Sequence, residues 1–287
     1  MIKILVPVDF TSISENGLNL ATDLARRTNA DLYIVNFLSE PYQSSFTVTG
    51  DTAKKVDDEQ TLYHIEMIKA SQKRLLALAD EYNQEGVNLH HQVYKATFKE
   101  GLNKFVEENG IDLIVMGTSG EQSFEEKFTG NHVEQAMELT SCPVISVKGL
   151  YDIENFNRIV VAIDDMPEND PNRHLVFLKI FCEAIDAKLH LVHVASEDTL
   201  LMEFYEHEKR LHRIALNNGI NNYTVSILPS SDVEKAIVKF ARKINAGLIG
   251  VLKQNQAGFF RFFTSQLSDD MVKSTDMPVI TFNFTDN

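Results

Sequence analysis

Residues 3–9 of the chain are Lys-Ile-Leu-Val-Pro-Val-Asp, and residues 158–164 are Arg-Ile-Val-Val-Ala-Ile-Asp. Each segment begins with a basic residue, continues as a short apolar run and ends in an aspartate. Three further pairs of segments match in the same order along the chain: 30–37 with 187–194, 111–117 with 246–252, and 142–147 with 277–282. Ordered self-similarity of this kind is the signature of a repeated structural unit. The sequence therefore predicts one domain written twice in tandem.

The matched segments are nearly continuous runs of Val, Ile and Leu, which is how strands buried on both faces of a parallel sheet read. Segments of helical period lie between them: 59–82, 98–108, 131–139, 172–185, 198–217, 231–244 and 265–273, besides one after Asp9. That last helix has capping-box spacing from Ser12 to Glu15 and an apolar stripe at Leu18, Ala21, Leu24 and Ala25. Alternating strands and helices favour an α/β fold with two open, doubly wound sheets of five parallel strands each.

Polar residues replace strand character between the two copies. We expect a first domain at 1–148, a linker at 149–157 and a second domain at 158–287. The first copy also carries extra residues around 40–58, rich in Ser, Thr, Asp and Lys. They read either as a lid over a ligand or as a plain surface insertion, and we favour the insertion.

Composition narrows the class of protein. The formal net charge of −14 argues against a nucleic-acid surface, because phosphate backbones attract basic patches. No apolar run approaches 18 residues, so no membrane span is expected. The start of the chain lacks the longer apolar stretch of a secretory signal, and two cysteines do not suggest a disulfide framework. We therefore predict a cytoplasmic protein that binds neither nucleic acid nor membrane.

Three glycines of the first copy form a candidate phosphate site. Asp9 ends the first strand and Gly117 the fourth. Gly120 follows Gly117 by three positions, and after nine more residues Gly130 opens a helix. Ligands of doubly wound sheets bind outside the carboxyl ends of the strands where the strand order reverses. Glycines let the backbone approach an anion, and a helix N-terminus offers free N–H groups.

These strings, together with Cys142-Pro-Val-Ile, resemble the universal stress protein family, and the resemblance covers both copies. It implies an adenine-nucleotide alpha-hydrolase-like sheet of order 3-2-1-4-5 and a G-x2-G-x9-G-[S/T] pattern in members that bind ATP. It further implies a stress-response regulatory protein that binds ATP or AMP, with Mg, in its first copy. Efficient catalysis is not expected; at most the resemblance implies slow ATP hydrolysis.

Carried over by position, the resemblance implies a set of nucleotide-binding residues. Asp9 would accept from adenine or ribose, and Phe37 would form an apolar wall for the base. The other members would edge the adenosine or run along the phosphates. The full set is Pro7, Val8, Asp9, Phe37, Met116, Gly117, Ser119, Gly120, Gly130, Asn131, His132 and Val133.

Two departures fall at the phosphate end of this set. Asn131 stands where the family has a hydroxyl residue, and Val133 stands where it usually has threonine. The lost donor would cost on the order of 1.5–3 kcal/mol toward a charged phosphate, about one to two decades of affinity. The adenosine end of the predicted site is therefore better kept than the triphosphate end, which leaves weaker or AMP-like binding open.

The second copy keeps Asp164 but replaces all three glycines, by Leu252, Asn255 and Ser265. We therefore predict no nucleotide there. The cluster 259–263, Phe-Phe-Arg-Phe-Phe, either fills the vacated site or exposes a partner surface, and we favour filling. Since the family usually pairs through its last strand, residues 144–147 are expected to pair with 279–282 as a pseudo-dimer within one chain. A homodimer of whole chains stays open.

The alternative to nucleotide binding is an interaction or scaffold module of the same fold that binds no nucleotide in either copy, with an unidentified protein partner. An adenylyl-transferring enzyme is disfavoured, because Asp9-Phe-Thr-Ser lacks a pyrophosphate-binding signature. His190 and His193 lie three apart on a strand and so face opposite sides, and Glu203 with His207 lacks further ligands; no metal site is predicted.

Overall fold

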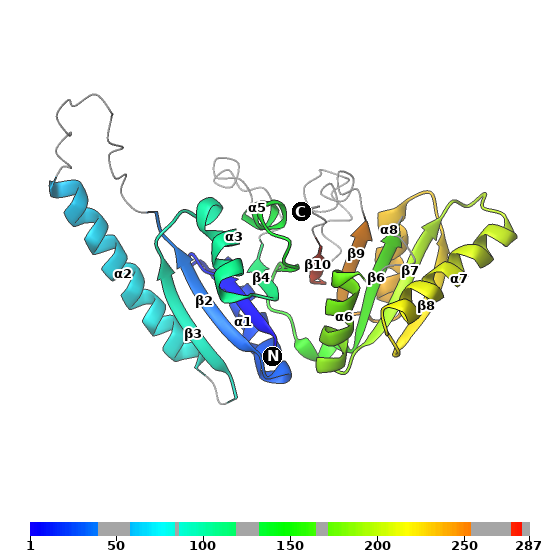
Figure 1. Ribbon diagram of the computed structural model, residues 1–287, viewed down its shortest axis with the longest axis horizontal. Coiled ribbons are helices and arrows are strands. Elements are labelled where there is room, and N and C mark those ends of the chain that lie inside the picture. Colours follow the sequence, from blue (N-terminus) through cyan, green and yellow to red (C-terminus); the bar gives the residue numbers. More distant parts are fainter. Residues whose placement is uncertain (40–57, 84–85, 119–131, 165–171, 254–276, 283–287) are drawn as a thin grey trace, which may run out of the picture.

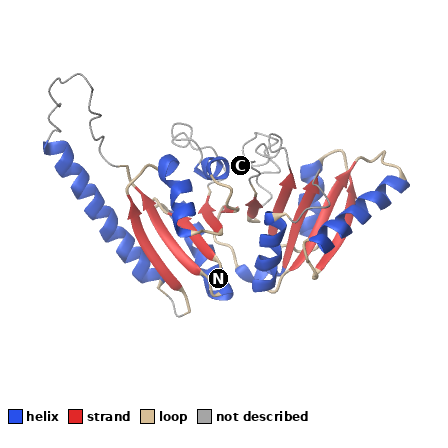
Figure 2. Cartoon of the chain, viewed as in Figure 1, coloured by secondary structure: helices blue, strands red, loops and turns tan. Residues whose placement is uncertain are grey.

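The computed structural model describes residues 1–39, 58–83, 86–118, 132–164, 172–253 and 277–282. Strands and helices alternate along the chain (Figure 2). The strands are β1 Lys3–Pro7, β2 Asp31–Phe37, β3 Asn88–Tyr94, β4 Leu113–Gly117, β5 Val144–Val147, β6 Arg158–Asp164, β7 Lys188–Ala195, β8 Tyr223–Pro229, β9 Leu248–Lys253 and β10 Val279–Thr281. The helices are α1 Ser12–Thr28, α2 Asp58–Tyr82, α3 Phe98–Asn109, α5 His132–Leu139, α6 Arg173–Ala184, α7 Leu201–Asn217 and α8 Val233–Lys243, with the 3-10 helix η1 at Ile153–Asn157.

All ten strands join one sheet of order β3-β2-β1-β4-β5-β10-β9-β6-β7-β8 (Figure 1). Each half has the order 3-2-1-4-5, counted within its own copy, and its strands are parallel. This confirms the predicted fold class, with five strands in each half. The register repeats as well: β1 places Ile4 beside Leu113, and β6 places Ile159 beside Leu248. The segments that match in the sequence therefore occupy equivalent strands in the two halves.

The halves meet where β5 pairs with β10, which we call the seam. The pairing is antiparallel and sets Ile280 opposite Ile145. The register confirms the predicted pairing of the last strands of the two copies. Because the seam continues the backbone hydrogen bonding of both sheets, the second copy supplies the partner strand that β5 would otherwise leave open.

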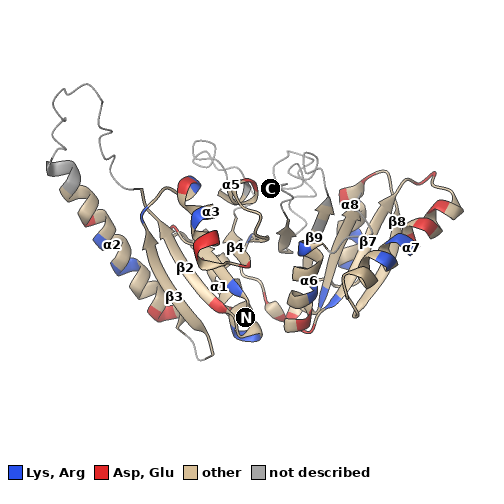
Figure 3. Ribbon diagram, viewed as in Figure 1, with Lys and Arg blue, Asp and Glu red and all other residues tan. Residues whose placement is uncertain are grey.

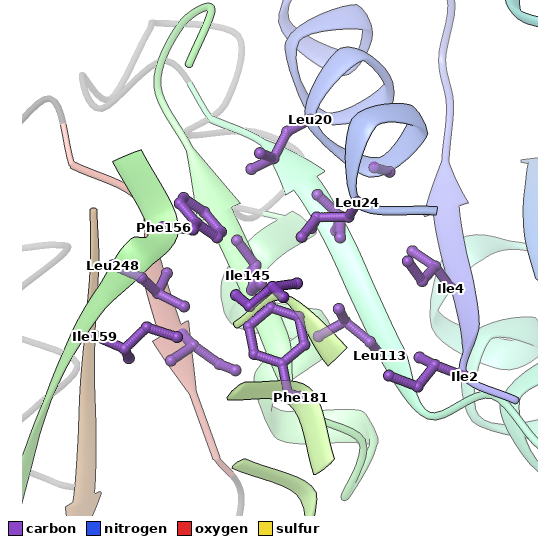
Figure 4. Close-up of a cluster of buried hydrophobic side chains, with 14 of the residues drawn as sticks. Ile2, Ile4, Leu20, Leu24, Leu113, Ile145, Phe156, Ile159, Phe181 and Leu248 are labelled. Carbon is purple, nitrogen blue, oxygen red and sulfur yellow. The ribbon is translucent and has the colours of Figure 1, made fainter. Parts of the chain in front are cut away.

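Helices cover both faces of the sheet, and one core cluster crosses the seam. On one face, side chains from α1, α2, η1, α6 and α7 pack together over strands of both halves. Figure 4 shows Leu24 and Ile4 of the first half in the same cluster as Phe156, Phe181 and Leu248. On the opposite face α3 and α5 form one cluster and α8 another. The halves are therefore joined by a common core as well as by strand pairing.

The predicted helices agree with the structure to within a few residues, except that residues 265–273 lie outside the described ranges. The stripe predicted for α1, at Leu18, Ala21, Leu24 and Ala25, is fully buried. In Figure 3, charged residues are interspersed along the described helices, α2 and α7 among them. The domain limits at 148 and 158 stay predictions; η1 lies within the predicted linker.

The predicted capping box at the start of α1 is wrong by one residue. Thr11, not Ser12, is the N-cap, and its hydroxyl accepts a hydrogen bond from the Ser14 amide at 3.2 Å. The reason is the preceding turn: Asp9 accepts hydrogen bonds from both the amide and the hydroxyl of Thr11, which orients the threonine as the cap. The carboxylate of Asp9 thus determines which of two adjacent hydroxyl residues, Thr11 or Ser12, caps the helix.

The two histidines of β7 lie on opposite faces, as the strand period predicts. His190 points to the α8 side, where its ring meets Phe240 edge-on and its Nδ1 lies 2.7 Å from the Thr224 hydroxyl. His193 points to the α7 side, where its ring stacks on His207. Joint metal binding by the β7 pair is thereby excluded by geometry.

His190 gives a pH-dependence of stability. Burial lowers the pKa of its imidazole below the ordinary value of 6.5, and nearby Lys188 and Arg158 lower it further. Its buried Nε2 has no hydrogen-bond partner. Since the folded state binds the proton less well than the unfolded state, stability is complete above pH 6.5 and falls below it.

We expect His190→Gln to lose less stability than the wild type between pH 7 and pH 5, measured by urea unfolding at several pH values. The matched control is His91→Gln, because His91 is exposed on the edge strand β3. If the two variants have the same pH dependence, His190 does not carry the effect.

Candidate functional site

The two halves differ where the central strands end. β1 pairs with β2 along its whole length, but with β4 only at Ile4–Leu113 and Leu5–Ile114. The remaining residues of the two strands extend beyond that ladder. In the second half, β6 pairs with β9 at six positions, as far as Asp164–Lys253. The central strands therefore stop pairing early in the first copy, at the edge where doubly wound sheets bind ligands.

Asp9 stands in the turn that follows β1. Its Oδ1 accepts the Thr11 hydroxyl at 2.6 Å and the Thr11 amide at 3.0 Å, so neither of these bonds occupies Oδ2. Partial burial raises the pKa of the Asp9 carboxyl, but hydrogen bonds from Thr11 and Ser14 lower it by more, and the net pKa lies below its ordinary value. Asp9 is therefore ionised at neutral pH, held in place by Thr11, and partly surrounded by protein while still open to solvent.

Gly117 packs against the first turn of α1. A Cβ added to Gly117 would overlap the carbonyl oxygen of Ile13. From the helix side, a Cβ added to Gly17 would lie 2.6 Å from the Gly117 nitrogen. From the sequence Gly117 was expected to face a phosphate; in the structure the close approach of α1 requires glycine here whether or not a ligand binds.

The second copy uses the equivalent position differently. Leu252 is fully buried in the core cluster that crosses the seam, and it pairs with Ile163 of β6. Nine positions separate Asp164 from the start of α6, whereas three separate Asp9 from the start of α1. At the position equivalent to Gly117, the second copy therefore accommodates a leucine side chain as part of its core. The side chain of Asp164 lies outside what the structure describes.

Phe37 belongs to an aromatic cluster on the α3 face. Its ring makes edge contacts with Tyr94, Phe98 and Phe105 at centroid distances of 5.5–6.2 Å. Phe98 in turn contacts the ring of His132, at the start of α5, at 4.9 Å. The structure thereby connects two predicted site residues, Phe37 and His132, through a third ring.

The structure describes eight of the predicted residues. Met116 and Val133 are buried, so Val133 serves the core at the position where the family pattern has a hydroxyl donor. Pro7, Val8 and Asp9 lie together at the end of β1, and Gly117 ends β4. Four predicted residues lie outside the described ranges: Ser119, Gly120, Gly130 and Asn131.

Two buried polar residues beside this turn, Asn36 and Ser71, were not predicted from the sequence. The Asn36 side-chain amide donates to the Val8 backbone carbonyl at 2.6 Å, and the Ser71 hydroxyl donates to the Asn36 side-chain oxygen Oδ1 at 2.7 Å. The available signal was an asparagine inside the apolar run of residues 32–37. Buried polar groups need partners, so such a residue implies a partner from a distant element.

Within the described ranges, no group of three or more His, Cys, Asp or Glu side chains is placed to hold a metal ion. None of the described helices combines the length and apolar character needed to cross a membrane.

A family model described as the universal stress protein family matches residues 1–148, half of the chain. The chain belongs to the universal stress protein family. It is thus a stress-response protein of that family, and at 287 residues it is about twice the size of one family domain.

Relatives and solved structures agree with this assignment. A universal stress protein of Methanocaldococcus jannaschii is 25% identical over 152 residues, which cover 51% of this chain and 81% of that protein. A universal stress protein of Bacillus subtilis is 24% identical over 149 residues, covering 51% of this chain and 98% of that protein. The crystal structure of a universal stress protein from Archaeoglobus fulgidus has a TM-score of 0.66 at 18% identity and covers 98% of this chain and 96% of that chain. That likeness extends the family fold over both halves.

Proposed function

We propose that the first copy, residues 1–148, binds ATP or AMP at the carboxyl ends of β1 and β4, and that the bound state is the signal in a cytoplasmic stress response. The observation that carries the proposal is the early end of the β1–β4 ladder, beside an ionised Asp9. In the second copy the corresponding ladder runs on to Asp164, and Leu252 fills the core. We therefore assign no nucleotide to residues 158–287.

We place the adenosine against Pro7, Val8 and Asp9, with Phe37 on the base side. Buried Val133 leaves the phosphate end poorer in side-chain donors, which supports AMP or weakly held Mg-ATP as the ligand. At the adenosine end, the Asp9 carboxylate would lie too far from the γ-phosphate of ATP to activate a water molecule. We therefore propose that the protein has no efficient catalytic activity. Because the seam uses β5 within the chain, a homodimer would have to form through another surface.

The first test is nucleotide release and titration. We expect adenine nucleotide to be released when freshly purified protein is denatured, or heat to be evolved on calorimetric titration with Mg-ATP or AMP. No release, together with no heat and no thermal shift at millimolar ligand, would refute the proposal and leave the scaffold alternative.

A second test places the site. Asp9→Asn keeps the shape but removes the charge, and we expect affinity to fall about tenfold or more, as for a lost charged hydrogen bond. The matched control is Asp164→Asn, at the equivalent position of the second copy, which should leave affinity unchanged. Equal losses in the two variants would show that the nucleotide does not bind at Asp9.

A further inference from the structure

Helix α2 is anchored to the turn that carries Asp9. Two residues of α2 that lie three positions apart connect the helix to this turn: Ser71 indirectly and Arg74 directly. Ser71 does so through Asn36, whose side chain donates to the Val8 carbonyl. Both Asn36 and Ser71 are buried, with 8% and 6% of their surface exposed. Since the Val8 amide also donates to Val35, both backbone polar groups of Val8 have partners.

Arg74 contacts Phe10, the residue that follows Asp9. Its guanidinium carbon lies 4.3 Å from the centroid of the Phe10 ring, and its Nη2 donates to the Phe10 carbonyl at 3.4 Å. Phe10 has a φ of 65°, a left-handed conformation that bulky side chains rarely adopt. Such a conformation persists only where neighbouring contacts hold it, and it concentrates at functional sites. Here Arg74 supplies a cation–π interaction and a hydrogen bond, and the Phe10 side chain also packs against the core cluster that crosses the seam.

The second copy repeats the contact to the strand-end carbonyl with other residues. The buried positions of α2 and α7 have the same spacing: Leu75, Leu78 and Ala79 against Leu211, Ile214 and Ala215. That register sets His207 at the position of Ser71 and Arg210 at that of Arg74. His193 replaces Asn36; its Nδ1 donates to the Ile163 carbonyl at 3.1 Å, and its ring stacks on His207 at 4.2 Å. In both copies, therefore, the same helix fixes the same strand-end carbonyl.

Because the contact to the strand-end carbonyl recurs with different side chains, it belongs to the geometry of the turn, and the contact of Arg74 with Phe10 is what the described residues add in the first copy. We propose that Asn36, Ser71 and Arg74, which we call the clamp, are positioning residues for the nucleotide site. They hold Val8 and Phe10 so that the Asp9 carboxylate is fixed before the ligand arrives. The inference rests on the proposed function, and it makes α2 the element that sets nucleotide affinity. A turn that is already ordered in the free protein binds its ligand more tightly, because no conformational entropy has to be lost on binding.

Arg74→Met tests the clamp, with Lys73→Met as the matched control. Lys73 is an exposed cation on the same helix, so its replacement removes equal charge without touching Phe10. We expect Arg74→Met to weaken nucleotide binding about tenfold and Lys73→Met less than twofold. Exchange of the Thr11 amide with solvent, followed by NMR, should accelerate in Arg74→Met alone, because that amide donates to Asp9.

A change at Phe10 separates positioning from direct contact with the ligand. Asparagine tolerates a positive φ, so Phe10→Asn should need the clamp less, and adding Arg74→Met to it should cost little further affinity. If the tenfold loss persists in the Phe10→Asn background, Arg74 touches the ligand and the inference is wrong. An equal loss of nucleotide affinity in Lys73→Met would show that the effect comes from the net charge of the helix, and this result would also overturn the inference.

Failure of the proposed function is distinguishable from failure of the clamp. If the wild type binds no nucleotide, the proposed function fails, and the Thr11 exchange rates still decide whether Arg74 orders the turn. If the wild type binds and Arg74→Met changes neither affinity nor exchange, the clamp alone is refuted.

Discussion

Replacing Gly117 with alanine is expected to lower the free energy of unfolding by about 3 kcal/mol or more, at the upper end of what overpacking costs. The added methyl would overlap the Ile13 carbonyl of α1, a backbone atom that no side-chain rotation can remove. Either the first turn of α1 or the end of β4 must shift, and a Cβ on Gly17 would likewise lie too close to β4, 2.6 Å from the Gly117 nitrogen. Urea or thermal unfolding of the purified variant measures the loss.

Gly149→Ala is the matched control for this substitution. A Cβ there has nothing within 4 Å, so a change within about 0.5 kcal/mol is expected, as for a surface substitution. Equal stabilities of the two variants would mean that α1 adapts freely, and our account of the close packing would fail. The result also bears on ligand studies: a leucine at position 117 disturbs the fold itself, so Asp9→Asn is the cleaner probe of nucleotide binding.

The second large effect is expected at the seam. Ile280 is fully buried opposite Ile145, and its Cγ2 lies 2.9 Å from where a Cβ on Gly250 would stand. Ile280→Ala should cost about 2–5 kcal/mol, the range for removing a large buried aliphatic side chain. Because the surrounding cluster contains side chains of both halves, calorimetry should show the unfolding of both halves shifted to lower temperature.

Leu216→Ala provides the control on α7, where the side chain is 66% exposed, and should change stability by no more than about 0.5 kcal/mol. If calorimetry resolves two transitions and only one of them moves in Ile280→Ala, the halves unfold independently. The common core would then not couple them.

The fold was largely predictable because its main signals are local. Buried parallel strands appear as short apolar runs, and the stripe from Leu18 to Ala25 predicts the buried face of α1 without knowledge of its partner. The start of α1 was not predictable to one residue, because Ser12 and Thr11 are both good caps. The Asp9 carboxylate decided between them by binding Thr11.

The candidate site was predictable only in part. Asp9 and Gly117 could be placed at strand ends from the repeat and the family pattern. The packing role of Gly117 could not, because it depends on how closely Ile13 approaches from another element. The clamp was equally hidden: Ser71 lies 35 positions from Asn36, and Arg74 lies 64 from Phe10.

The sequence by itself determined the duplication, the α/β class and the loss of all three glycines from the second copy. These features follow from residue type and order, which the chain carries before it folds. Only the tertiary structure decided that β1 and β4 stop pairing after Leu5 while β6 and β9 pair to their ends, and that Phe10 is held at a positive φ. Register at a strand end and strain in a turn depend on contacts between distant elements, and no local pattern of residues specifies those contacts.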